Sequence, residues 1–287
     1  MNIWLVGARL RTLPAAVVPV AVGAALCAGE SGAIWWRAIP ALGVSLLLQI
    51  GVNYANDYSD GIRGTDDQRV GPSRLVASGL VPAGRVKTAA LAAFAGAAVL
   101  GFVLAWSTSW WLLAVGLAAL AAGWFYTGGR HPYGYLGFGE VFVFVFFGLV
   151  ATVGTTYVIL QRLPALSWLL GSAVGSLACA LLVVNNLRDI PTDAAVGKKT
   201  LAVRLGDAAT RRLYQSLMVA ALLLGALGSM MNPGCIAVVA AVPFGISPLR
   251  AVRSGAAGAR LVEVLGRTGR VQMVVGALLS VGLVLGR

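Results

Sequence analysis

The sequence predicts an all-α fold, a polytopic membrane bundle of nine transmembrane helices. Hydrophobic residues make up 59% of the 287 residues and charged residues only 11%, whereas an ordinary soluble domain carries about 25% charged residues. Most of the surface must therefore face a lipid bilayer. The net charge of +12 does not indicate nucleic-acid binding, because the basic residues are spread over short connectors and form no basic helix or sheet face.

Nine apolar stretches are long enough to cross about 30 Å of hydrocarbon. Backbone polar groups in lipid need partners within the protein, so each stretch should be a helix. Pro14 and Pro19 interrupt the first stretch, which we interpret as a membrane helix and not as a cleavable signal peptide. Pro233, Pro243 and Pro248 lie in or beside the eighth. The predicted spans are residues 12–29, 36–56, 87–106, 109–127, 137–160, 165–186, 213–231, 234–250 and 270–286.

The basic residues predict the orientation. If the N-terminus is cytoplasmic, the cytoplasmic connectors hold all but three of the 22 Lys and Arg residues, the exceptions being Arg37, Arg162 and Arg287. Cytoplasmic connectors are enriched in Lys and Arg, and this distribution also favours an odd number of spans. We therefore expect a multi-pass protein of the cell membrane, with a single membrane domain over residues 1–287 and a cytoplasmic N-terminus.

Most acidic residues gather on the same side. The second and sixth predicted helices end there, and two longer loops, about 57–86 and 187–212, should follow them. We expect Pro191 to kink or end the sixth helix. Six of the ten acidic residues lie at these two places, namely Asp57, Asp60, Asp66, Asp67, Asp189 and Asp193. A functional site therefore belongs on the cytoplasmic side.

The two acidic clusters repeat one pattern. Asn-Asp-x-x-Asp at residues 56–60 recurs as Asn-Asn-x-x-Asp at residues 185–189, 129 positions later. This indicates an internal duplication, with two half-sites facing each other across the bundle. A single Asp at a helix end can serve interfacial solvation alone, but the repetition favours a functional site.

The clusters have the composition of a magnesium and diphosphate site. Asn53, Asn56, Asp57 and Asp60 fall on neighbouring i, i+3 and i, i+4 positions of a helix, so their oxygens can converge. Oxygen ligands without His or Cys suit Mg²⁺, which shares its remaining coordination with water and substrate phosphate. Neighbouring basic side chains can bind phosphate oxygens. These candidates are Arg63, Arg74, Arg188, Lys198, Lys199 and Arg204.

These residues resemble a known family. Residues 56–60 (Asn-Asp-Tyr-Ser-Asp) and 189–193 (Asp-Ile-Pro-Thr-Asp) are similar to the two Asp-rich motifs of the UbiA-type membrane prenyltransferases. The resemblance implies a nine-helix enzyme that uses Mg²⁺ to join a polyprenyl diphosphate to an aromatic acceptor. It extends to about residue 210, through Ala8–Pro14, Asn53–Asp67, Gly71–Gly79, Tyr126–Gly129 and Gly197–Gly206.

Within the family, the chain is similar to the branch whose acceptor is 1,4-dihydroxy-2-naphthoate. The broader motif has another Asp where this chain has Gly64, and the naphthoate branch tends to carry it at the position of Asp66. The branch implies loss of the ring carboxylate as CO₂ and formation of demethylmenaquinone, a step of menaquinone biosynthesis. The metal ligands that we expect are Asp57, Asp60, Asp66, Asp189 and Asp193, and all but the auxiliary Asp66 are expected to be catalytic.

Amides and aromatic residues complete the predicted substrate site. Tyr126 and Arg130 flank the connector after the fourth helix and are candidates for the acceptor, but an interfacial aromatic belt explains them equally well. The five Phe residues between 138 and 147 either line a channel for the isoprenoid tail or face lipid. The residues predicted to bind substrate are Asn53, Asn56, Arg63, Arg74, Tyr126, Arg130, Asn186, Lys198, Lys199 and Arg204.

Three other functions share part of this sequence pattern. Another aromatic acceptor, such as 4-hydroxybenzoate, stays open. A secondary transporter also has repeats and intramembrane acids, but here the acids lie at one membrane face. A CDP-alcohol phosphotransferase would continue the motif at residues 57–61 with two residues and then Ala-Arg, where this chain has Gly64-Thr65. His131 is the only histidine, which argues against a His-based metal site or triad.

Overall fold

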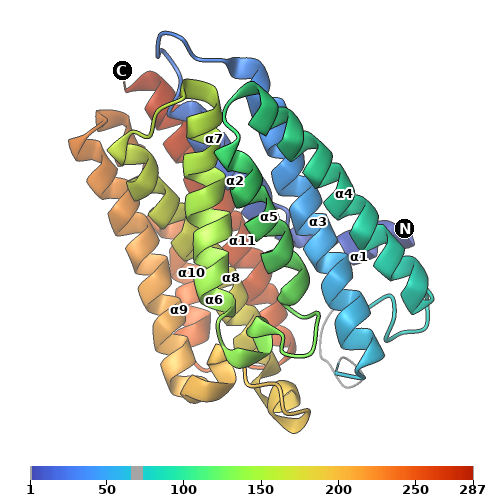
Figure 1. Cartoon of the computed structure of the whole chain (residues 1–287). Coiled ribbons are helices and arrows are strands. Elements are labelled where there is room, and N and C mark those ends of the chain that lie inside the picture. The colour runs from blue at the N-terminus through green and yellow to red at the C-terminus, as the bar shows by residue number, and fades with distance from the viewer. Residues whose placement is uncertain (1, 66–73, 287) are drawn as a thin grey trace.

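A computed structural model describes residues 2–65 and 74–286, and this part of the chain contains helices and no strand (Figure 1). The α-helices are α1 (Ile3–Ala8), α2 (Pro14–Ala25), α3 (Ala38–Ile62), α4 (Ala83–Ser107), α5 (Trp111–Phe125), α6 (Gly139–Val143), α7 (Ala151–Leu160), α8 (Ala165–Ala195), α9 (Leu201–Leu227), α10 (Val242–Arg253) and α11 (Ala259–Leu285). The 3₁₀ segments are η1 (Leu10–Thr12), η2 (Trp35–Arg37), η3 (Tyr133–Leu136), η5 (Gly228–Met230) and η6 (Pro233–Ala241), and η4 (Phe144–Val150) is a π-helix.

The described helices confirm an all-α, multi-pass membrane protein. Seven are long and apolar enough to cross a membrane, and eight if the bent pair at the N-terminus counts as one span. That pair, α1–η1 and α2, bends by 52°, and Pro14 occupies the first position of α2, where a missing N–H costs nothing. The predicted span 109–127 corresponds to α5, whose 15 residues measure only about 22 Å.

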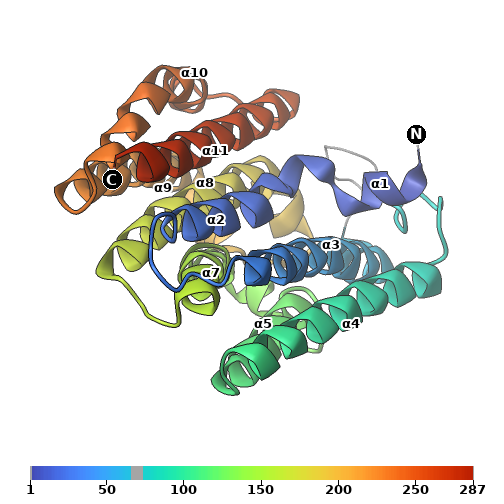
Figure 2. The ribbon, with the colours of Figure 1, turned by 90° about the horizontal axis from the view of Figure 1, so that it is seen from above.

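The long helices lie side by side as a bundle (Figure 1). α3 packs along α4, α8 packs along α9, and α2 lies between α3 and α11 (Figure 2). α8 is the most buried candidate span, and its apolar residues form the main core with α9, η6 and α11. The C-terminal ends of α3 and α8 lie at the same end of the bundle, the lower end in Figure 1.

The two loops expected at about 57–86 and 187–212 are shorter than the sequence predicts. α3 extends to Ile62, and α8 continues through Pro191 to Ala195, so only residues 196–200 separate it from α9. Proline in a helix removes one backbone donor and costs about 3 kcal/mol. The helix continues nevertheless, because tertiary packing buries the residues around Pro191, among them Leu187, Asp189 and Asp193. The described motif acids therefore lie on helices and not in loops.

A glycine contact sets the position of η4. A Cβ added to Gly148 would lie 2.5 Å from the Gly175 Cα on α8, which is too close for any side chain. The π-helical turn therefore crosses α8 backbone against backbone. It follows α6 within one apolar span, Gly139–Leu160, and brings this aromatic segment against the core helix.

Arg37 joins three helices at the end opposite the motifs. Its side chain is buried, at 5% exposure. One terminal nitrogen donates to the Val158 carbonyl of α7 at 3.0 Å, and the other donates to the Ser107 carbonyl at the end of α4. A cation at helix C-termini satisfies carbonyls that have no intrahelical donor.

We expect Arg37→Ala to lower the free energy of unfolding by about 3 kcal/mol, because two buried carbonyls lose a charged donor. The control is Arg162→Ala. Arg162 pairs with Glu30, but the two side chains are 58% and 35% exposed, and such a pair contributes less than about 1 kcal/mol. Thermal unfolding of the detergent-purified protein measures both. Equal shifts in Tm would contradict this role of Arg37.

Candidate functional site

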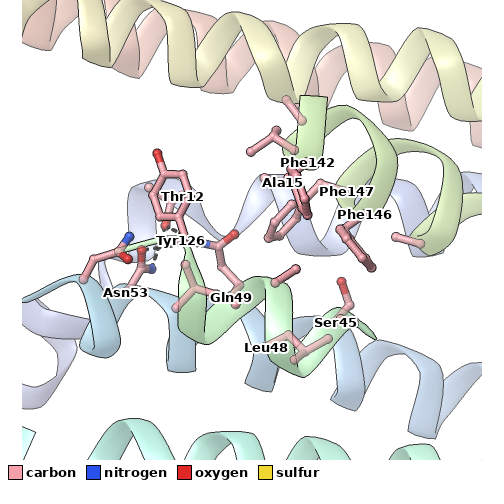
Figure 3. Close-up of a pocket in the computed structure, with 18 of the residues that line it drawn as sticks. Thr12, Ala15, Ser45, Leu48, Gln49, Asn53, Tyr126, Phe142, Phe146 and Phe147 are labelled. Carbon is pink, nitrogen blue, oxygen red and sulfur yellow. Dashed lines mark hydrogen bonds between the residues drawn. The ribbon is translucent and has the colours of Figure 1, made fainter. Parts of the chain in front are cut away.

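A cavity of about 770 Å³ opens between α3, α5, η4 and α8 and is closed at one side by η1. Its two ends differ in character (Figure 3). Thr12, Gln49, Asn53 and Tyr126 gather at one end, and the Phe side chains of the α6–η4 segment at the other. A cavity of this kind can hold a molecule with a polar head and an apolar body.

One face of α3 supplies a polar stripe to this cavity. Ser45, Gln49, Asn53, Asn56 and Asp60 all line it, at intervals of three or four residues that place side chains on one helix face. The stripe therefore contains three of the predicted residues and two that the sequence reasoning missed. The missed pair continues the same spacing toward the N-terminus, which was the signal available.

Asn53 holds the N-terminal segment against α3. Its amide nitrogen donates to the Ala8 carbonyl at 2.9 Å and to the Thr12 hydroxyl at 3.0 Å. Gln49 donates to the same hydroxyl and to the Asn53 side-chain oxygen, each at 3.3 Å. These bonds hold η1 against α3, and this contact closes one side of the cavity.

Asp57 points away from the cavity. Its two carboxylate oxygens accept hydrogen bonds from the backbone N–H groups of Leu75, at 2.9 Å, and Val76, at 3.0 Å. It is 1% exposed and is absent from the described lining of the cavity. Asp57 therefore ties the segment that carries Arg74 to α3, and Arg74 itself lines the cavity.

The two Asp motifs meet through Lys198. Its ammonium nitrogen lies 3.6 Å from a carboxylate oxygen of Asp60 on α3 and 3.7 Å from one of Asp193 on α8. Both acids are almost fully buried and both line the cavity. The Tyr135 hydroxyl, from η3, donates to Asp60 at 2.5 Å. Carboxylates 133 positions apart in sequence thus face one cation.

Asp189 is held by its neighbour on α8. The Arg188 guanidinium donates to both carboxylate oxygens of Asp189, at 2.6 and 2.7 Å, and to the Asn185 side chain at 2.9 Å. The Arg188 side chain is only 1% exposed. Asn186, the next amide, donates to Glu140 at 3.0 Å. Paired, hydrogen-bonded charges are the form in which a buried site tolerates ions.

The donor set fits a magnesium ion that is shared with a substrate. Among residues 2–65 and 74–286, no three carboxylate, thiol or imidazole groups are arranged to hold a metal by themselves. Mg²⁺ does not need such an arrangement, since it is commonly bound by one or two carboxylates together with water and phosphate oxygens. The position of Lys198 shows that one cation can face both Asp60 and Asp193.

Some of the other predicted residues line the cavity and some do not. Asn186 and Tyr126 line it. The Arg63 guanidinium instead donates to the Thr127 carbonyl and, at 2.5 Å, to the Gly129 carbonyl. Three exposed basic residues are absent from the described lining: Arg130, Lys199 and Arg204. Asp66 lies outside the described residues.

The tyrosines near the site stay protonated. Burial raises the pKa of Tyr133, and burial together with the Asp60 carboxylate raises the pKa of Tyr135 above its ordinary value. Two cations also lie near the Tyr135 ring, with the Arg63 guanidinium carbon 5.5 Å and the Lys198 ammonium 4.7 Å from its centroid. Tyr135 was missed because no sequence motif contains it.

An aromatic wall lines the apolar end. Phe142, Phe146 and Phe147 line the cavity, whereas Phe138 is exposed. The Tyr133 and Phe142 rings stack at 4.0 Å between centroids, and Phe142 and Phe146 stack at 6.2 Å. Three of the five Phe residues of the tract thus line the cavity.

A sequence model of the UbiA prenyltransferase family matches residues 16–258. The chain belongs to the UbiA prenyltransferase family. Among similar UbiA proteins, 1,4-dihydroxy-2-naphthoate octaprenyltransferase of Mycobacterium tuberculosis is 51% identical over 271 residues, which cover 94% of this chain and 93% of that protein. The Escherichia coli protein of the same name is 37% identical, over 80% of this chain and 77% of that protein.

Solved UbiA structures have the same fold. A UbiA homolog from Aeropyrum pernix superimposes with a TM-score of 0.73 at 17% identity, covering 94% of this chain and 97% of that chain. A homolog from Archaeoglobus fulgidus, bound to DMAPP and Mg²⁺, superimposes with a TM-score of 0.65 at 16% identity and 98% coverage of both chains.

Proposed function

We propose that this protein transfers a polyprenyl group from polyprenyl diphosphate to 1,4-dihydroxy-2-naphthoate, with loss of the ring carboxylate, and so serves menaquinone biosynthesis. One observation carries the proposal: Asp60 and Asp193 both lie beside the Lys198 ammonium, in an aromatic-lined cavity. The names of the similar proteins support the choice of acceptor.

The buried acids would hold Mg²⁺. Asp60, Asp189 and Asp193 line the polar part of the cavity together with Asn56 and Asn186, and Asp66 is retained as an auxiliary ligand. The sequence predicts Asp57 as a direct metal ligand. We propose instead that Asp57 fixes the segment that carries Arg74 to α3. When bound, Mg²⁺ neutralises charge that develops on the departing diphosphate.

The basic lining residues would bind the diphosphate. Arg74, Arg188 and Lys198 line the cavity beside the acids, and fixed cations at the leaving oxygen stabilise its charge as the allylic C–O bond breaks. That bond's electron pair leaves with the diphosphate. We propose no direct diphosphate contact for the four basic residues that are absent from the described lining of the cavity, namely Arg63, Arg130, Lys199 and Arg204.

The apolar wall would protect the allylic cation. Phe142, Phe146 and Phe147 exclude water from the space where the cation forms. The ring carbon that carries the carboxylate attacks the cation and forms the new C–C bond, and the carboxylate then leaves as CO₂, returning its electron pair to the ring. The product is the hydroquinone form of demethylmenaquinone. No strong base is needed, in agreement with His131 being exposed and the only histidine.

The membrane topology follows the same proposal. We propose nine spans, with the short α5 as the fourth, one domain over residues 1–287, and an internal repeat that relates α3 to α8. The ends of α3 and α8 lie at one end of the bundle, and most basic residues lie in connectors assigned to that side. That end should face the cytoplasm, across the plasma membrane.

Tyr135→Phe should weaken Mg²⁺-dependent activity by about 10-fold, since one strong hydrogen bond to a carboxylate contributes about 1.5 kcal/mol. Because the pKa of Tyr135 is raised, its hydroxyl remains a donor from neutral to mildly alkaline pH. The ratio of wild-type to variant rates should therefore be constant between about pH 7 and pH 9. Tyr157→Phe is the matched control on α7. A ratio that approaches one at alkaline pH would contradict this role.

The acceptor is tested with purified protein, Mg²⁺, a polyprenyl diphosphate and a panel of aromatic acids. We expect prenylated product and one CO₂ per turnover with 1,4-dihydroxy-2-naphthoate, and no product with 4-hydroxybenzoate. The reverse preference would overturn the acceptor assignment. Turnover in detergent, without a membrane gradient, distinguishes the enzyme from a secondary transporter.

A further inference from the structure

A second hollow lies on the outer surface of the bundle, between the start of α2, α10 and α11. It encloses about 690 Å³. Three arginines line it, Arg11, Arg267 and Arg270, beside the apolar side chains of Pro14, Phe244 and Met273. No step of the proposed reaction uses this groove.

Two glycines of α11 line the groove without filling it. They are Gly266 and Gly269, and a Cβ added to Gly266 would meet no atom within 4 Å. Arg267 is fixed at the rim, because its guanidinium donates to the Ser247 hydroxyl of α10 at 2.9 Å. Arg270 follows on the same side of α11 and is exposed.

The charge of the groove is positive. Glu263 is the one acidic residue in its described lining, and it pairs with Arg267 at 3.3 Å with 68% of its side chain exposed. The described lining of the groove thus holds three guanidinium groups and one solvated carboxylate. Arginine binds phosphate oxygens through paired donors and is well suited to a phosphate group.

The groove also carries exposed apolar side chains. Phe244 is 54% and Met273 46% exposed, beside the arginines. Arg11 and Val262 line both this groove and the large cavity, so the groove lies beside the polar end of the site. Cations next to lipid-facing apolar side chains match a molecule with a phosphate head and acyl chains.

We propose that this groove binds one anionic phospholipid of the bilayer. The lipid phosphate contacts Arg267 and Arg270, and an acyl chain lies along Phe244 and Met273. The bound lipid contacts η1 through Arg11 and so supports the outer side of the wall that closes the reaction cavity. This site is separate from the proposed diphosphate site and does not depend on it.

The test is a lipid titration of the detergent-purified protein, followed by native mass spectrometry, with phosphatidylglycerol and with phosphatidylcholine. Arg267→Gln/Arg270→Gln should bind the first phosphatidylglycerol about 30-fold more weakly, at about 1 kcal/mol per basic residue, and bind phosphatidylcholine as the wild type does. Arg253→Gln/Arg260→Gln removes equal charge from exposed positions of the same region and should leave both affinities unchanged. Thermal unfolding checks that both variants are folded.

Three outcomes would overturn the proposal. Equal losses in the two double variants would show diffuse surface charge instead of a site. Equal wild-type affinity for the two lipids would exclude selection of an anionic headgroup. Displacement of phosphatidylglycerol by millimolar inorganic phosphate would show a soluble anion as the occupant.

Discussion

Asp60→Asn should lower the rate of prenyl transfer by about 10³-fold, the largest single-residue effect that we expect. Removing one group that stabilises developing charge typically costs 10²–10³-fold, and Asp60 also contacts Lys198 and Tyr135. The substitution preserves shape, so the loss should fall on kcat and on the Mg²⁺ requirement and leave the Tm nearly unchanged. Single-turnover rates at saturating polyprenyl diphosphate measure it.

Asp207→Asn is the control for this prediction. Asp207 is 60% exposed and pairs with Arg211 within α9, outside the described lining of the cavity. Its substitution should change the rate less than two-fold, as expected of an exposed pair. An Asp60→Asn variant that retained wild-type activity would contradict the assignment of the site.

Removing divalent metal should reduce prenyl transfer to the uncatalysed background, and Mg²⁺ should restore it. Without the metal, Asp60 and Asp193 would repel the substrate diphosphate, because Lys198 offsets only part of the charge of these two acids. The measurement is turnover in chelated buffer followed by Mg²⁺ titration, with Ca²⁺ as a larger cation for comparison. Full activity in thoroughly chelated buffer would contradict the proposal.

The periodicity of α3 explains why part of the site was predictable. Asn53, Asn56 and Asp60 follow helical spacing and share one face, which their positions in the sequence already indicate. Asp57 is one position along and lies on another face, where it accepts two backbone N–H groups. A motif written as consecutive letters does not distinguish these directions.

Tertiary contacts decide where Arg63 and Tyr135 lie. Arg63 stands beside the acidic motif in sequence, yet its guanidinium is bonded to the connector after α5. Tyr135 comes from that same connector and reaches Asp60. Neither contact follows from local spacing, because each depends on how the connector folds over the end of α3.

The ends of α3 and α8 also depend on tertiary packing. Pro191 predicts a helix end from local preference, but burial of the surrounding residues outweighs that preference and α8 continues. The class of the protein was predictable because hydropathy depends on composition alone. The lengths of α3 and α8 beyond the apolar spans depend on packing around polar residues.

The most direct test of the account is the position of the metal. Mn²⁺ replaces Mg²⁺ and scatters anomalously, so a crystal with Mn²⁺ and a non-hydrolysable polyprenyl thiodiphosphate locates it. We predict a peak within about 2.2 Å of carboxylate oxygens of both Asp60 and Asp193, with the isoprenoid chain along Phe142 and Phe146. A metal bound away from these two acids, or a chain outside the cavity, would contradict the account.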